Sequence, residues 1–114
     1  MSEKNENLAE LSRQGSALAR AAPESIKAFQ ALMRAASTDG ALSSKTKELM
    51  AVAISIAMRC EGCVLFHVDG ARRRGATREE LAETIAVAIE MGGGPATVYG
   101  GKALAIFDAA AGDI

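Results

Sequence analysis

The chain has 114 residues, of which 49% are hydrophobic and 24% are charged, and its formal net charge is −1. This length predicts a single domain over residues 1–114 that can bury a real core. The balanced charge argues against nucleic-acid binding, which usually requires a basic excess, and the 4% aromatic content argues against a stacking platform for single strands. The polar N-terminus lacks a secretory signal, and the longest apolar stretch, residues 49–58, is about half of a membrane span, so we expect a cytoplasmic protein with no membrane partner.

Every element is predicted to be a helix. Alanine is abundant, the only prolines are Pro23 and Pro95, and no alternating strand pattern occurs. The first helix is expected at residues 7–21 and the second at residues 23–36, where Pro23 suits a first helical position. The second helix carries one apolar stripe, formed by Ile26, Phe29, Leu32 and Met33.

The third helix is expected to begin near Ser43 or Ser44, either of which can act as its cap, and to run to about Ala57. It is apolar nearly all round after Glu48, which predicts burial in a core or between subunits. The fourth helix is expected from Cys60 to Arg74, with Gly75 as its stop. The run Arg72-Arg73-Arg74 then lies in the last turn, where the helix dipole favours cations.

Thr77 and Glu80 have the spacing of a capping box, which predicts a fifth helix to about Met91. Its buried side is expected to carry Leu81, Ile85, Val87, Ala88 and Ile89. The glycines at 92–94 break this helix, and Pro95 begins a last helix that ends near Ala110. The sequence therefore predicts one all-α domain of about six helices, with part of its packing between subunits of a helical oligomer.

The residues with distinctive chemistry are Cys60, Cys63 and His67. The two cysteines have the C-x-x-C spacing of reversible disulfides and lie at an expected helix N-terminus, where free backbone N–H groups and the dipole favour a thiolate. His67, the only histidine, follows Cys63 by four residues, so both lie on one helix face. His67 can therefore accept or hold the proton of Cys63.

Glu48 is a fourth candidate because it is a lone acidic residue near the start of an apolar helix. That helix rises about 18 Å from Glu48 to Cys60, and an antiparallel return brings His67 back by about 10 Å. The remaining gap is within reach of the two side chains, directly or through one water. Glu48 can therefore orient His67, which activates Cys63.

Glu48, the segment Cys60-x-x-Cys63-x-x-x-His67 and the later run from Met91 to Ala96 resemble the carboxymuconolactone decarboxylase and alkylhydroperoxidase D-like family over residues 41–107. The resemblance implies an all-α alkylhydroperoxidase D-like domain that assembles as trimers or hexamers and reduces hydroperoxides through thiols. It further implies that Cys63 attacks the peroxide, Cys60 resolves the product, and His67 with Glu48 relays protons. The implied partners are a hydroperoxide and an external dithiol of lipoyl or thioredoxin-like type, without a cofactor or metal.

The chain departs from the better-studied peroxidases of this family at Gly62, where they carry a histidine. Three other interpretations of these residues stay open at this point. The same cysteine pair can serve a general disulfide oxidoreductase. Alternatively, the chain is a non-catalytic helical oligomer with structural cysteines, or with Cys60, Cys63, His67 and Glu48 as zinc ligands, although a structural zinc site usually needs two separated ligand pairs.

Overall fold

The chain folds into helices joined by short connections. The computed structural model describes residues 3–112, and the side chains of residues 8–110. In chain order the helices are α1 (Glu3–Ala21), α2 (Pro23–Ser37), α3 (Ser44–Ala57), α4 (Glu61–Arg73), α5 (Arg78–Gly92) and α6 (Gly94–Gly112). Residues 3–112 contain no strand, which confirms the predicted all-α class of about six helices.

The helix ends follow the local chemistry of the sequence. Ser43 caps α3 by accepting a hydrogen bond from the backbone of Thr46, and the capping box of Thr77 and Glu80 opens α5. Gly93, with φ of 72°, separates α5 from α6 in a backbone region that favours glycine. These caps confirm the sequence predictions, and the bounds differ only by a few residues.

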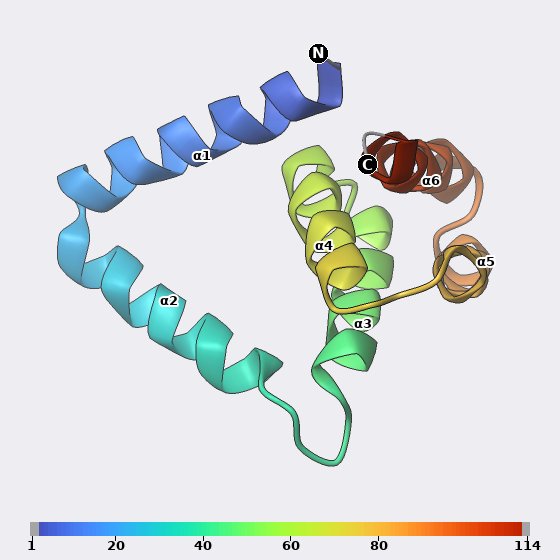
Figure 1. Ribbon diagram of the computed structural model, residues 1–114, viewed down its shortest axis with the longest axis horizontal. Coiled ribbons are helices and arrows are strands. Elements are labelled where there is room, and N and C mark those ends of the chain that lie inside the picture. The colour runs from blue at the N-terminus through green and yellow to red at the C-terminus, as the bar shows by residue number, and fades with distance from the viewer. Residues whose placement is uncertain (1–2, 113–114) are drawn as a thin grey trace.

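Helices α3 to α6 form a four-helix bundle that contains the whole hydrophobic core (Figure 1). Helix α3 packs against α4 and α5, and α6 packs against α4 and α5. The buried apolar core consists of Val52, Ile56, Val64, Val68, Ala71, Ala76, Leu81, Ile85, Ala88, Ala96, Ala103 and Phe107. Since α3 and α4 lie side by side in this bundle, residues from both helices can share one site.

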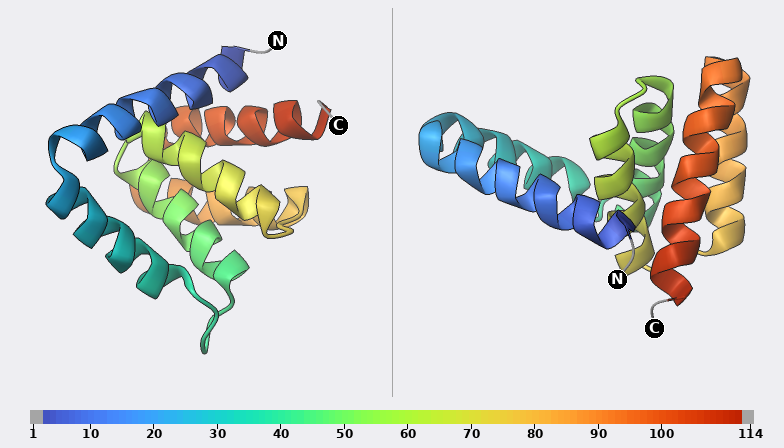
Figure 2. Two further views of the ribbon diagram at one scale, coloured as in Figure 1. Left: turned by 60° about the vertical axis from the view of Figure 1, so that its left-hand side comes forward. Right: turned by 90° about the horizontal axis from the view of Figure 1, so that it is seen from above.

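Helices α1 and α2, residues 3–37, form an arm that projects from the bundle (Figures 1 and 2). The arm contacts the bundle where α1 meets α4 and where α2 meets α3. None of its described side chains, residues 8–37, is buried. Phe29 and Leu32, from the stripe expected on α2, are 55% and 62% exposed.

One expectation about burial, the one for Val87, was wrong. Val87 was expected on the buried side of α5 but is 56% exposed, because it lies about 200° around the helix from the buried Ile85. The burial expected for α3, in a core or between subunits, is found within this chain on one side only. Val52 and Ile56 are buried, whereas Ile54 and the C-cap residue Met58 face outward. The bundle covers one side of α3 and leaves the opposite apolar side open.

Candidate active site

Cys60 and Cys63 are joined by a disulfide at the start of α4. Arg59, with a positive φ of 59°, reverses the chain after α3, a backbone conformation that few residues other than glycine adopt. Cys60 is consequently the N-cap of α4, where its Sγ accepts a hydrogen bond from the backbone N–H of Cys63 at 3.2 Å. The sharp turn between α3 and α4 thus positions both sulfurs.

This position affects the chemistry of the cysteines once they are reduced. The first backbone N–H groups of a helix have no partner within the helix, and its N-terminus carries a partial positive charge. Both effects favour a thiolate on Cys63, which lies in the first turn of α4. Cys60 and Cys63 are each half-buried, so the pair is not sealed in the core.

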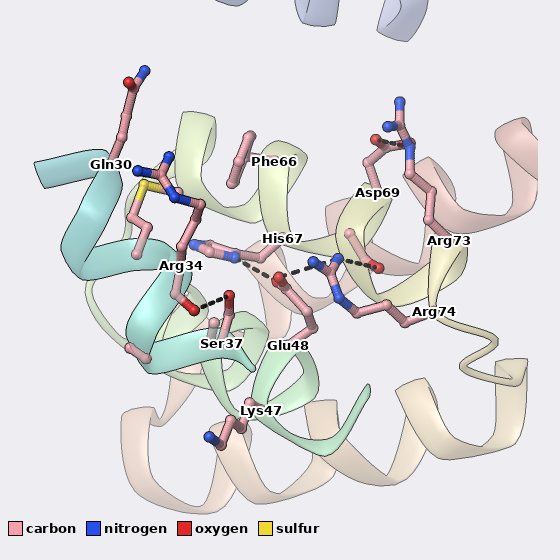
Figure 3. A pocket seen from close by; sticks show the side chains of 14 residues that line it. Gln30, Arg34, Ser37, Lys47, Glu48, Phe66, His67, Asp69, Arg73 and Arg74 are labelled. Carbon is pink, nitrogen blue, oxygen red and sulfur yellow. Dashed lines mark hydrogen bonds and ion pairs between the residues drawn. The ribbon is translucent and has the colours of Figure 1, made fainter. Parts of the chain in front are cut away.

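Glu48 and His67 form a hydrogen-bonded pair between α3 and α4 (Figure 3). Nδ1 of His67 lies 2.7 Å from Oε1 of Glu48, and the side chains are 26% and 9% exposed respectively. A carboxylate only accepts hydrogen bonds, so Nδ1 carries the proton and Nε2 of a neutral ring retains its lone pair. The pair can therefore hold His67 in the tautomer that accepts a proton at Nε2.

Two further residues, Arg74 and Gly70, complete the surroundings of Glu48. An Arg74 guanidinium nitrogen lies 3.4 Å from Oε2 of Glu48, and the same side chain donates to Ser44 Oγ at 2.7 Å and to the Gly70 carbonyl at 3.1 Å. A Cβ atom added at Gly70 would lie 3.0 Å from Cδ and Oε1 of Glu48. The missing side chain thus makes room for the carboxylate against α4.

The roles of Gly70 and Arg74 were missed in the sequence, where the arginine run was interpreted only as helix-end charge. Arg72 and Arg73 both pair with Asp69, but Arg74 turns toward α3. The available signal was spacing, because His67, Gly70 and Arg74 follow each other at three and four residues and therefore share a helix face.

A cavity of about 680 Å³ opens beside the pair (Figure 3). It is bounded by α2 on one side and by α3 and α4 on the other. Its lining consists of Gln30, Met33, Arg34, Ala36, Ser37, Lys47, Glu48, Ala51, Phe66, His67, Asp69, Gly70, Arg73 and Arg74. The arm therefore contributes one wall of the cavity that His67 faces.

The structure brings the four predicted site residues together in two pairs. Cys60 and Cys63 are bonded to each other, and Glu48 contacts His67. Within the described part of the chain, no hydrogen bond joins His67 to either sulfur of the oxidised pair, and neither cysteine lines the cavity. Cys63 lies one helical turn, about 6 Å, along α4 from His67.

Gly62, between the cysteines, lies under the arm. A Cβ atom added there would lie 3.4 Å from Cδ1 of Leu11 on α1. The position at which better-studied peroxidases of the resembled family carry a histidine is therefore covered here by an apolar side chain.

Neither a cluster of metal ligands nor a membrane-spanning helix occurs among the described residues. Residues 8–110 contain no group of three histidine, cysteine, aspartate or glutamate side chains placed to hold a metal ion. Among residues 3–112, no helix is both long enough and apolar enough to span a bilayer.

Solved structures share this architecture. A carboxymuconolactone decarboxylase family protein from Legionella pneumophila, solved in its apo form, is 41% identical, with a TM-score of 0.89 over 94% of this chain and 96% of that one. A protein of the same family from Thermotoga maritima, for which a part in the antioxidative response has been suggested, is 31% identical, with a TM-score of 0.69 over 74% of this chain and 87% of that one.

Sequence comparisons agree with the structural ones. An uncharacterised protein of Cupriavidus necator is 53% identical over 102 residues, which is 90% of each chain. A protein of the cox locus of Paracoccus denitrificans, also uncharacterised, is 48% identical over 81 residues, 71% of this chain and 73% of that one. The sequence model of the carboxymuconolactone decarboxylase family matches residues 23–109, and the chain therefore belongs to this family.

Proposed function

We propose that this protein is a thiol-dependent peroxidase that reduces hydroperoxides through Cys60 and Cys63. The observation that carries the proposal is the combination of a C-x-x-C disulfide at the N-terminus of α4 with a Glu48–His67 pair that joins α3 to the same helix. The suggested antioxidative role of the Thermotoga maritima relative supports the same reading.

The proposed reaction has two steps. The Cys63 thiolate attacks the terminal peroxide oxygen, the O–O bond breaks, and the leaving alkoxide takes a proton to become an alcohol. Cys63 is then a sulfenic acid, which the Cys60 thiol attacks to form the disulfide with release of water. An external dithiol restores both thiols by thiol–disulfide exchange and is itself oxidised.

In this mechanism Glu48 and His67 transfer protons. Nε2 of His67 accepts the thiol proton of Cys63 when the peroxide enters and returns it to the leaving oxygen. Glu48 keeps the ring oriented and stabilises the imidazolium that forms in between. Within the described residues, no hydrogen bond joins His67 to the sulfurs of the oxidised pair. The proton therefore passes either directly between His67 and the reduced Cys63 side chain or through one bridging water.

The proposal includes partners and a compartment. The reductant is a dithiol of lipoyl or thioredoxin-like type, and the chain acts as a homo-oligomer, a trimer or hexamer. A disulfide that must be reduced in every cycle suits a compartment that keeps thiols reduced, so we place the activity in the cytoplasm. Dihydrolipoamide and a thioredoxin system, supplied separately, would identify the reductant by which one sustains turnover.

The first test is a free-thiol count with intact mass on the reduced protein, before and after one equivalent of an organic hydroperoxide. We expect rapid loss of both thiols and a mass decrease of about 2 Da, the two hydrogens of one disulfide. In C60S, Cys63 should instead gain about 16 Da as sulfenic acid, whereas C63S should not react. Thiols that survive the peroxide but are oxidised by small disulfides would replace this proposal with a general disulfide oxidoreductase.

The proton relay is tested by the rate of thiol loss in H67Q and E48Q. H67Q should be slower by about 100-fold, the lower end of what general acid–base catalysis contributes. E48Q retains an amide oxygen that can accept a hydrogen bond from Nδ1, so the rate of thiol loss should fall less in E48Q than in H67Q. Equal rates in both variants and the parent would remove the relay from the mechanism.

A further inference from the structure

The cavity beside His67 carries an excess of positive charge. Its charged lining comprises four basic residues, Arg34, Lys47, Arg73 and Arg74, and two acidic residues, Glu48 and Asp69. The cavity volume of about 680 Å³ lies in the range of sites for small organic ligands. The size and the charge of the cavity therefore both bear on which ligand it selects.

Both acidic residues of the cavity are already paired. Glu48 contacts His67 and Arg74, and Asp69 lies 2.9 Å from Arg73. These two ion pairs account for two of the four basic residues. Among the described residues, Arg34 and Lys47 are the two basic residues of the lining that form no ion pair, so they are the most available anchors for a ligand anion.

Arg34 is the better anchor of the two. Lys47 Nζ already donates to the Thr38 carbonyl at 2.7 Å, whereas the Arg34 guanidinium has no ion pair or hydrogen bond within the described part of the chain. Figure 3 shows Arg34 extending from α2, across the cavity from Asp69 and Arg73. A guanidinium in this position can bind a carboxylate through two parallel hydrogen bonds.

The other lining residues indicate the chemical character of the rest of the ligand. Apolar side chains contribute to all three walls, Met33 and Ala36 from α2, Ala51 from α3 and Phe66 from α4. They suit an uncharged organic body attached to the anion.

We propose that this cavity binds organic carboxylates, with Arg34 as the anion anchor. On the assumption that the proposed function holds, it follows that the preferred substrates are hydroperoxides that bear a carboxylate, such as those of fatty acids. The apolar walls then hold the chain of the substrate, and the anchor sets its orientation relative to α4.

Binding is tested on the oxidised protein without any peroxide, using octanoate and 1-octanol as probes in titration calorimetry. We expect octanoate to bind about ten times more tightly than octanol, since a hydrogen bond to a charged group contributes about 1.5 kcal/mol or more. R34Q should remove most of this difference. K27Q removes the same charge from α2 outside the cavity lining and should keep it.

Two results would overturn the anion anchor. One is equal affinity for octanoate and octanol in the parent protein. The other is a preference for octanoate that R34Q retains, with circular dichroism confirming that the variant is folded.

Turnover separates this proposal from the proposed function. The ratio of kcat/KM for linoleic acid hydroperoxide to that for its methyl ester should be about ten in the parent and K27Q, and near one in R34Q. If the ratio in the parent is near one while the peroxide still oxidises both thiols, the proposed substrate class is contradicted and the proposed peroxidase activity stands. Octanoate binding without any peroxide-driven thiol loss contradicts the peroxidase and leaves the carboxylate site intact.

Discussion

At the scale of single residues, the candidate site depends on how one buried carboxylate is held. Glu48 contacts His67 on one oxygen and Arg74 on the other, so its charge is paired where water is largely excluded. An unpaired carboxylate in this position would be costly. Gly70 has no side chain, and this leaves the space that the carboxylate of Glu48 fills.

The first prediction concerns G70A. The new Cβ would lie 3.0 Å from Cδ and Oε1 of Glu48, so the carboxylate must shift away from α4 and lengthen its contact with His67. We expect the rate of peroxide-driven thiol loss to fall by about tenfold or more, because small displacements of catalytic groups are costly. Stopped-flow measurement of thiol loss gives this rate.

The control for G70A is G101A. Gly101 is also a helical glycine, but nothing lies within 4 Å of a Cβ atom added there. G101A should keep the parent rate. Parent rates in both variants would contradict the role of Gly70 in seating Glu48.

A second prediction concerns G62H, which restores the histidine of better-studied family peroxidases. The Cβ alone would be in ordinary contact with Leu11, but the imidazole ring beyond it must displace that side chain. We therefore expect α1 to detach from α4, with faster amide exchange in α1 and unchanged protection in the bundle. Hydrogen exchange read by mass spectrometry measures both.

G62A is the matched variant, because a methyl group at this position needs no movement of Leu11. It should leave the exchange of α1 unchanged. Protection of α1 in G62H equal to that in the parent would mean that the arm accommodates the ring.

The sequence predicted part of this site for a physical reason. Residues four apart on a helix share a face, so Cys63 and His67 could be grouped without a structure, and helix rise placed Glu48 within reach. Gly70 and Arg74 could not be assigned in the same way. Their contact with Glu48 depends on the distance and angle at which α3 crosses α4, which no local pattern determines.

At the scale of helices, the bundle is held by close approaches at particular glycines. The Cβ of an alanine at Gly100 would lie 2.6 Å from Cγ2 of Ile85, so α5 and α6 pack more closely here than any side chain would allow. The helix ends, in contrast, are determined locally. The caps at Ser43 and Thr77 were predictable because capping needs only neighbouring residues.

The third prediction compares G100A with G101A, adjacent glycines in one helix. G101A should stabilise the protein by up to about 1 kcal/mol, the propensity difference between alanine and glycine in a helix. G100A should destabilise it by about 1–3 kcal/mol, because the methyl group forces α5 and α6 apart. Urea unfolding followed by circular dichroism measures both changes, and a G100A at least as stable as G101A would contradict the close contact.

At the scale of the whole molecule, the isolated chain leaves large apolar side chains uncovered. They include Leu18, Phe29 and Leu32 on the arm, and Met50, Ile54 and the C-cap residue Met58 along one side of α3. The sequence predicted that the apolar stripe of α2 and the apolar surface of α3 would be covered but not by what, since the pattern of one chain is the same for an intramolecular and an intermolecular contact. Exposed apolar surface of this kind is typical of interaction sites.

The last prediction is that copies of this chain associate through the open side of α3. Met50, Ile54 and Met58 are spaced four residues apart and are 47%, 56% and 68% exposed, so they form one apolar row that a second copy can cover. Light scattering coupled to size exclusion should give at least three times the chain mass of 11.8 kDa. I54E places a charge in the middle of the row, where burial is costly, and should raise the dissociation constant by at least about tenfold.

A82E adds the same charge on the exposed surface of α5 and should leave the mass unchanged. A parent protein that elutes as a monomer would contradict the association. An oligomer that I54E leaves intact would place the interface on a surface other than this row.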